Sequence, residues 1–332
     1  MSPSPFRDVG LRELAREKLH HGPGFFINPF NPDEPRSLLR VLRWKLASAN
    51  RFRPFYDGER VVPVSIDWRP VRETRGLSIT FLRHACVLIR DHECSILVDP
   101  VFFGLSRFVR DFTPVAFDVA EMPRLDHVLV THGHYDHLDI RSLRSVGGEA
   151  NIVTPLGYED TLAGIGMARH TQLDWFESLD DGEREITLLP CDHWTMRNPL
   201  KGPDRALWGS YLVRSASGPT IYVSGDTASF DRFEEIGREF TIDLAILNLG
   251  AYEPRWIMAG SHLNPAEAVR AFKALGAARM MIVHWGTFRL GDEPVHFPPL
   301  DIRREMEHEG LLDRLVDLGH GETFFLSGDQ LP

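Results

Sequence analysis

The sequence contains few cysteines and no long uninterrupted apolar run. Its three cysteines, Cys86, Cys94 and Cys191, form no Cys-x-x-Cys pair and are odd in number, which argues against a disulfide framework and favours a reducing compartment. No stretch approaches the roughly 18 apolar residues that a membrane-spanning helix needs. The N-terminus also lacks the charged segment followed by an apolar one that is typical of a secretory signal. We therefore expect a cytoplasmic protein.

The sequence also lacks an excess of positive charge. Its 332 residues include 37 lysines and arginines against 47 aspartates and glutamates, a formal net charge of −10, which argues against a protein that coats nucleic-acid phosphates. The charge is uneven: residues 1–75 carry 14 basic and 9 acidic side chains, a net +5, whereas residues 76–332 carry 23 and 38, a net −15. We therefore predict a basic N-terminal arm (1–75) and an acidic body (76–332) with different partners.

Prolines interrupt the arm and exclude long regular elements from most of it. After the first ten residues they fall at Pro23, Pro29, Pro32, Pro35, Pro54, Pro63 and Pro70. Between Pro35 and Pro54, leucines recur at helical spacing while most basic residues lie elsewhere on the wheel. The leucines are Leu38, Leu39, Leu42 and Leu46, and the basic residues are Arg36, Arg40, Arg43 and Lys45. This pattern predicts one basic amphipathic helix. We favour a helix that docks its leucine face on the body, and the alternative is a helix on a membrane surface.

From Gly76 onward, short apolar runs alternate with turns and helices. The runs are LSITFL, ACVLI, SILVDP, DHVLVTH, NIVTP, ITLLP, SYLV, TIYVSGD, DLAILNLG and MMIVHWG, and they predict strands. The segment NPAEAVRAFKALG predicts a helix, because Asn264 can cap it, Pro265 suits its first position and Gly276 can end it. Strands that alternate with helices indicate a layered α/β protein.

One loop concentrates imidazoles immediately after the apolar run HVLV. It reads Thr-His-Gly-His-Tyr-Asp-His-Leu-Asp over residues 131–139 and contains His132, His134, Asp136 and His137. Neutral imidazole and carboxylate are suitable ligands for Zn²⁺ and similar ions, and a loop at a strand end can aim several side chains at one point. The residues His193, Asp226 and His284 each follow another strand-like run. Each alone is more often a structural residue, but together with the loop they predict a metal site.

These motifs resemble the metallo-β-lactamase superfamily, whose signature is His-x-His-x-Asp-His followed by a later His, an Asp and a last His. The segments HYDHLD, HW, LWGS, GDT, FEEIG, GAYEPRW, H-x-NP-x-EAV and HWGTF are similar to the N-acylphosphatidylethanolamine-hydrolysing phospholipase D family. The arm segments FFINPF and LLRVLRWKL are similar to the N-terminal part of that family. A more distant resemblance is to the ascorbate-6-phosphate lactonase family.

The resemblance implies an αββα sandwich, with two mixed sheets face to face and helices outside, as the catalytic domain 76–332. It implies two divalent metal ions, with zinc favoured and manganese or iron as alternatives. The implied ligands are His132, His134 and His193 for one metal, Asp136, His137 and His284 for the second, and Asp226 as a bridge. The implied catalytic groups are Asp136, Asp226 and His262.

The resemblance also assigns residues around the metals. Asp99 would orient a metal-binding histidine, although an Asp that starts a turn before Pro100 fits equally. His262 would contact phosphate or protonate the leaving group, and a residue that only caps the following helix is nearly as well supported. Tyr252 and Trp256 would contact substrate, although aromatic residues are more often part of a core. Cys191, near His193, is interpreted as a small buried residue.

The implied activity is cleavage of N-acylphosphatidylethanolamine to N-acylethanolamine and phosphatidic acid. The alternatives are a lactonase or another phosphodiesterase, and least of all a non-catalytic scaffold. The implied partners are a phospholipid or other phosphodiester and, through the arm, a membrane surface. Two departures concern the lipid groove: the sequence has Arg83-His84-Ala85-Cys86 where the family has Gly-His-Ala and then Thr or Ser, and the stretch between DPVFF and MPRLDH is shorter.

Overall fold

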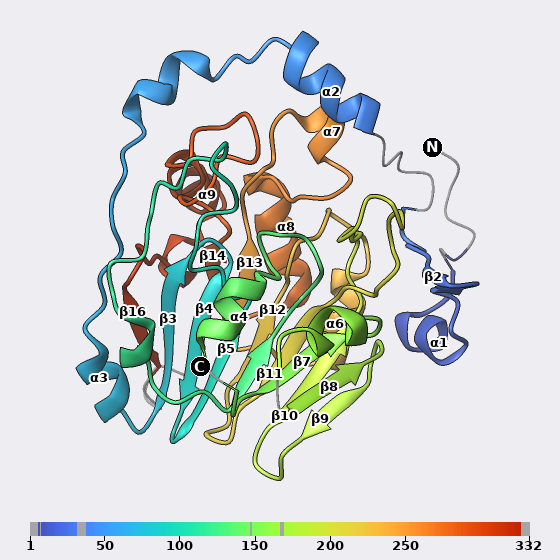
Figure 1. The fold of residues 1–332 in the computed structure, drawn as a ribbon, viewed down its shortest axis with the longest axis vertical. Helices are drawn as coiled ribbons and strands as arrows, with labels where there is room; N and C mark the ends of the chain where they lie inside the picture. Colours follow the sequence, from blue (N-terminus) through green and yellow to red (C-terminus); the bar gives the residue numbers. More distant parts are fainter. Residues whose placement is uncertain (1–5, 7, 32–37, 147, 167–168, 327–332) are drawn as a thin grey trace.

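Two sheets form the centre of the molecule (Figure 1). The computed structural model describes residues 6, 8–31, 38–146, 148–166 and 169–326. Within them, one sheet has the strand order β16 (Thr323–Leu326), β3 (Leu77–Arg83), β4 (Cys86–Asp91), β5 (Cys94–Val98), β6 (His127–Leu129), β7 (Asn151–Pro155) and β8 (Arg169–Leu173). The other has the order β15 (Leu315–Val316), β14 (Arg279–Val283), β13 (Leu244–Asn248), β12 (Thr220–Val223), β11 (Ser210–Arg214), β10 (Glu185–Leu189) and β9 (Ser178–Asp180). All ten apolar runs named above are strands.

Three hydrophobic cores show how the layers are stacked. The central core joins inward residues of both sheets, such as Ile79 and Ile246. The outer face of the first sheet packs against α3 (Trp68–Glu73), α4 (Ile140–Ser145) and α5 (Glu159–Ala163). The outer face of the second packs against α6 (Phe233–Glu239), α8 (Pro265–Leu275) and α9 (Phe297–His308). Because each sheet buries both faces, the order of layers is helix, sheet, sheet, helix, as predicted.

Both sheets are mixed, and their strand directions bring several loops to one edge. In the first sheet β3, β5 and β6 run the same way, because β4 is antiparallel to its two neighbours and β6 is parallel to β5. In the second sheet β10, β12, β13 and β14 share one direction. The loops that follow β6, β10, β12 and β14 carry the predicted metal ligands. A backbone hydrogen bond of 2.6 Å from His284 to His84 joins the two sheets at this edge.

The best-specified helix is α8. The Asn264 side chain accepts a hydrogen bond from the Glu267 backbone N–H, the Glu267 carboxylate accepts one from the Asn264 backbone N–H, and Gly276 ends the helix with φ 62°. Such a cap is worth about 1 kcal/mol, and a left-handed residue at the end suits glycine. The helix that follows His262 is therefore fixed at its start by Asn264, which corrects the alternative that His262 only caps it.

The arm runs around the outside of the sandwich (Figure 1). It contains α1 (Leu11–Arg16), the pair β1 (His21–Gly22) and β2 (Phe25–Phe26), the predicted helix α2 (Leu38–Ala47) and α3. Leu14 of α1 belongs to the central core, so part of the arm is integral to the body. In α2, Leu46 is 77% exposed while Trp44 is buried and donates to Asp292. The expected docking of Leu46 on the body is therefore wrong, because the helix uses Trp44 instead.

Arg36 and the side chains of Leu38, Leu39 and Leu42 lie outside the described residues. Among the helices of the described residues, none is long and apolar enough to cross a membrane. The division at residue 75 stays a prediction.

Candidate metal centre

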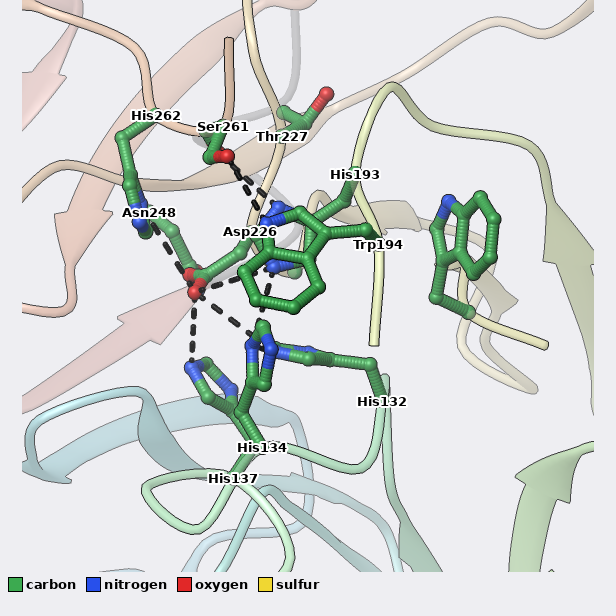
Figure 2. A network of polar contacts seen from close by, with 12 residues as sticks. His132, His134, His137, His193, Trp194, Asp226, Thr227, Asn248, Ser261 and His262 are labelled. Atoms are coloured by element: carbon green, nitrogen blue, oxygen red, sulfur yellow. Dashed lines mark hydrogen bonds and ion pairs between the residues drawn. The ribbon is translucent and has the colours of Figure 1, made fainter. Parts of the chain in front are cut away.

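The first group of donor atoms comes from three different loops (Figure 2). His132 and His134 follow β6, His193 follows β10, and Asp226 follows β12. His134 Nδ1 lies 2.9 Å from His132 Nε2 and 3.4 Å from His193 Nε2. Asp226 Oδ2 lies 3.8 Å from the Nε2 atoms of His132 and His193. Three imidazole nitrogens and one carboxylate oxygen therefore surround a common point.

The second group lies on the other side of Asp226. Asp136 Oδ2 is 3.4 Å from His284 Nε2 and 3.6 Å from His137 Nε2. Asp226 Oδ2 is 3.2 Å from His137 Nε2, and its Oδ1 is 3.3 Å from His284 Nε2. Asp226 therefore faces both groups, which is the position that a bridging carboxylate requires. All seven predicted ligands are brought together, in the two sets that were predicted.

The donor set fits a pair of divalent ions. Four ligands at about 2.1 Å around a tetrahedral zinc ion are separated from one another by about 3.4 Å, and the distances above scatter around that value. The Nε2 atoms of His137 and His284 are buried and have no hydrogen-bond partner among the described residues. Buried polar atoms are rarely left unsatisfied, so their orphaned state points to a cation between them.

The electrostatics of the cluster favour the same conclusion. Burial alone would raise the pKa of Asp226, but the surrounding imidazoles, His284 first, bring that pKa well below its ordinary value. Burial lowers the pKa of His132 and of His193 well below the ordinary imidazole value. At His137, burial is outweighed by neighbouring carboxylates, Asp226 first, which raise its pKa well above the ordinary value. The cluster thus combines ionised carboxylates with mostly neutral imidazoles, and these are the protonation states in which both groups bind metal ions. A bound cation would balance the negative charge of the carboxylates.

Asp99 supports both groups from behind. Its Oδ2 accepts hydrogen bonds from His137 Nδ1 at 2.7 Å and from the Thr131 hydroxyl at 2.6 Å, and its Oδ1 accepts from the Thr131 backbone. The same hydroxyl lies 3.0 Å from His132 Nδ1. One buried carboxylate therefore orients a ligand of each predicted metal, which favours the orienting role over a simple turn.

The loop that carries His193 is also held in place. His193 Nδ1 lies 3.2 Å from the Ser261 carbonyl oxygen, so its Nε2 points into the centre. Asn28 of the arm is buried and donates to Asp192 and to the His193 carbonyl oxygen, at 2.7 and 2.9 Å. The FFINPF segment thus shapes the metal centre directly, a role that the sequence did not reveal.

The remaining predicted residues occupy different surroundings. His262 Nδ1 lies 3.9 Å from Asp226 Oδ2, and its side chain is 16% exposed. Tyr252 is buried, and its hydroxyl donates to Asp301 of α9 at 2.7 Å. Trp256, in α7 (Arg255–Met258), is 43% exposed beneath Arg40 and Arg43 of α2. Tyr252 is part of the core, as the sequence favoured for both aromatic residues, whereas Trp256 is not. That either residue contacts substrate stays a prediction, which these positions do not support further.

His84 is the residue that sequence reasoning missed. It follows β3, whose end lies at the same edge, and its Nε2 lies 3.0 Å from Asp136 Oδ2. The signal was present, because a polar residue at the end of an apolar strand is the feature that identified the other ligands. As a single histidine after a strand, however, it resembled an ordinary structural residue. Cys191 is buried in the central core, as interpreted from the sequence.

Comparison with known proteins identifies the family. A family model described as "Beta-lactamase superfamily domain" matches residues 95–285, more than half of the chain and all seven predicted ligands. The chain belongs to the β-lactamase superfamily. It is 31% identical over 273 residues to N-acyl-phosphatidylethanolamine-hydrolyzing phospholipase D 1 of Caenorhabditis elegans, which covers 76% of this chain and 74% of that protein.

Two further similarities within the superfamily are informative. The chain is 32% identical over 225 residues to a UPF0173 metal-dependent hydrolase of Pelotomaculum thermopropionicum, which covers 67% of this chain and 90% of that protein. A possible metal-dependent hydrolase of Veillonella parvula aligns structurally with a TM-score of 0.62 at 18% identity, over 76% of this chain and 100% of that one. This last likeness concerns the fold alone and confirms the predicted sandwich. Family and donor clusters together support a metal-dependent hydrolase of the metallo-β-lactamase family.

Proposed function

We propose that this protein is a dinuclear metal-dependent phosphodiesterase of the phospholipase D type, which cleaves N-acylphosphatidylethanolamine to N-acylethanolamine and phosphatidic acid. The observation that carries the proposal is the position of Asp226 between two complete donor groups. The similarity to a phospholipase D over most of both chains supports this substrate class.

Each residue of the candidate centre has a role in the proposed hydrolysis. His132, His134 and His193 would hold one divalent ion and Asp136, His137 and His284 a second, with the Asp226 carboxylate available to both. Such ions would supply Lewis acidity and a water-derived nucleophile at neutral pH. In the hydrolysis, oxygen from water bonds to phosphorus and the P–O bond to the N-acylethanolamine breaks. The leaving oxygen takes up a proton and phosphatidic acid is released.

His262 is suited to contact the phosphoryl group. Its side chain keeps 16% exposure and that of Asp136 keeps 15%, against 1% or less for His132, His137 and His193. Burial lowers the pKa of His262 to about 4, so the imidazole is neutral near pH 7. A neutral imidazole donates a hydrogen bond but carries no extra proton, which favours phosphate contact over protonation of the leaving group.

We also propose that α2 contacts the membrane in which such a substrate resides. Val41 and Leu46 of α2 are 42% and 77% exposed, and Trp256 of α7 is 43% exposed. Arg40 and Arg43 lie over the Trp256 ring. Exposed apolar side chains among arginines are typical of peripheral binding to anionic lipid. Binding to phosphatidylserine vesicles that is lost at high salt supports this contact, and binding unaffected by salt and by anionic lipid contradicts it.

One observation favours a second candidate, an ester or lactone hydrolase. Arg83, where the phospholipase family has glycine, is fully buried. Its guanidinium donates to the Phe102 carbonyl oxygen at 3.1 Å and to Asp111 at 2.8 Å. It thereby ties residues 102–111 to the strand end beside His84. Because a glycine cannot make these side-chain hydrogen bonds, this loop has an anchor that the family pattern lacks, and we take this as support for a substrate other than a long-chain lipid.

The test compares substrates on one metal-loaded preparation. Elemental analysis counts the metals, and mass spectrometry follows N-acylethanolamine and phosphatidic acid released from N-acylphosphatidylethanolamine in mixed micelles. We expect both products, and their loss on chelation. Metal-loaded protein that leaves this diester intact but opens sugar-phosphate lactones would overturn the phospholipase proposal in favour of the second candidate.

A further inference from the structure

His84 occupies a backbone conformation that requires an explanation. Its φ is +49°, in the left-handed region that residues other than glycine seldom adopt. Two hydrogen bonds hold it there: its N–H donates to the Thr287 hydroxyl at 2.8 Å, and its carbonyl oxygen accepts from His284 at 2.6 Å. A residue whose strained backbone is held by hydrogen bonds at both its N–H and its carbonyl oxygen is often part of a functional site. Here the conformation turns the imidazole toward the second donor group.

The distances at Asp136 separate His84 from the predicted ligands. His84 Nε2 lies 3.0 Å from Asp136 Oδ2, the ordinary length of an N–H···O hydrogen bond. His284 and His137 lie 3.4 and 3.6 Å from the same oxygen, near the separation of two ligands of one ion. His84 therefore stands to Asp136 as a hydrogen-bond donor does.

The other nitrogen of His84 agrees with this tautomer. Its Nδ1 is buried and has no hydrogen-bond partner among the described residues, as is also true of His284 Nδ1, whereas the predicted ligands His137 and His193 have an oxygen partner at Nδ1. A metal-binding imidazole normally donates its second N–H to such a partner. An Nδ1 without a proton needs no acceptor, so the proton belongs on Nε2, facing Asp136.

We propose that His84 is a positioning residue, which donates its Nε2 proton to Asp136 Oδ2 and holds this carboxylate toward the second metal. The packing fixes the ring: its centroid lies 4.2 Å from that of His284 and 5.1 Å from that of Phe288. The inference rests on the metal centre of the proposed function and is independent of the substrate. It explains why an imidazole belongs at the end of β3, outside the range that the family model matches.

The test uses two variants and a matched control. His84→Gln retains an N–H donor near the Nε2 position, and His84→Ala removes it. His170→Ala deletes a half-buried histidine of β8, whose Nε2 lies 2.9 Å from the Thr154 hydroxyl and which belongs to none of the groups of possible metal ligands among the described residues. For each metal-free protein, Zn²⁺ is titrated against a chromophoric chelator to give the dissociation constants of the first and second ion. The melting temperature of each metal-free protein is measured alongside.

We expect His84→Ala to weaken binding of the second Zn²⁺ by about 10- to 100-fold, the usual effect of losing a group that supports a ligand. We expect His84→Gln to recover most of that loss, and the first Zn²⁺ to bind all variants alike. Unchanged binding of the second ion in His84→Ala would overturn the proposal. Equal losses in His84→Gln and His84→Ala would also overturn it, because the imidazole would then be a ligand itself. A wild-type protein that binds no Zn²⁺ would refute the metal centre rather than the role of His84.

Discussion

Two clusters of histidine and aspartate in this molecule have different consequences. At the metal centre, the ion-pair partners of Asp136 and Asp226 within the described residues are all imidazoles. In the second cluster, which we call the arm clasp, Asp174 binds His20 at 2.6 Å, His21 at 2.9 Å and the Lys18 ammonium. The clasp joins the arm to the body, and His20 stacks on Trp175.

The three clasp residues His20, His21 and Asp174 are also close enough together to hold a metal ion, but we expect them to bind none. In the clasp, one carboxylate is satisfied by two imidazoles and a lysine that supplies the positive charge. At the centre, two carboxylates share several imidazoles, and the Nε2 atoms of His137 and His284 have no hydrogen-bond partner among the described residues. The centre therefore differs from the arm clasp in its buried carboxylate charge, which no lysine or arginine neutralises among the described residues, and not in its residue types.

The largest expected effect comes from Asp226→Asn. Two opposite unit charges about 4 Å apart attract by about 4 kcal/mol at an effective dielectric constant of 20. Losing the Asp226 charge next to divalent ions therefore costs at least that much, or at least roughly 10³-fold in affinity. We expect the metal content to fall and hydrolysis to drop at least as far, measured by elemental analysis and by product release. Asp174→Asn is the matched control, because it makes the same change in the arm clasp. Loss of metal in the control, or normal metal in Asp226→Asn, would break the comparison.

A smaller effect is expected from Asp99→Asn. The variant keeps the size of the side chain but weakens the hydrogen bonds to His137 and Thr131. We expect about 10- to 100-fold weaker metal binding with both ions still bound at saturation. Chelator competition measures the affinity. An affinity equal to that of the wild type would show that Asp99 serves only its turn.

Part of the fold and most of the candidate site could be predicted from the sequence. Seven donors could be predicted from polar residues that directly follow apolar strands, because β6, β10, β12 and β14 all end at one edge. His84 also follows a strand but was not predicted, because it is the single histidine there. None of the four edge strands of the two sheets was predicted. β8 and β9 are only partly buried and lack an apolar run, β15 has two residues, and β16 is also only partly buried. The contacts of Arg83 and Asn28 depend on segments distant in the sequence, which no local pattern encodes.

The arm clasp should contribute stability rather than metal binding. Asp174→Ala leaves the buried His20 imidazole without its partner, and an unsatisfied buried donor costs about 1–3 kcal/mol. We expect urea unfolding to report a loss of that size while the metal content stays normal. A metal content that falls with Asp174→Ala would place a metal ligand in the clasp.

The smallest effect is expected from Lys18→Met. The lysine side chain is half exposed, and such ion pairs contribute about 0.2–1 kcal/mol. We expect a decrease of unfolding free energy within this range that is reduced further by salt. A loss larger than that of Asp174→Ala would mean that the ammonium, rather than the two imidazoles, holds the clasp together.

We propose that two metal ions share Asp226 at one edge of the sandwich. Anomalous scattering from crystals of the metal-loaded protein locates bound ions independently of activity. We predict two peaks about 3.5–4 Å apart, on either side of Asp226, and no peak at the arm clasp. A single peak at the centre, or a peak between His20, His21 and Asp174, would contradict this account.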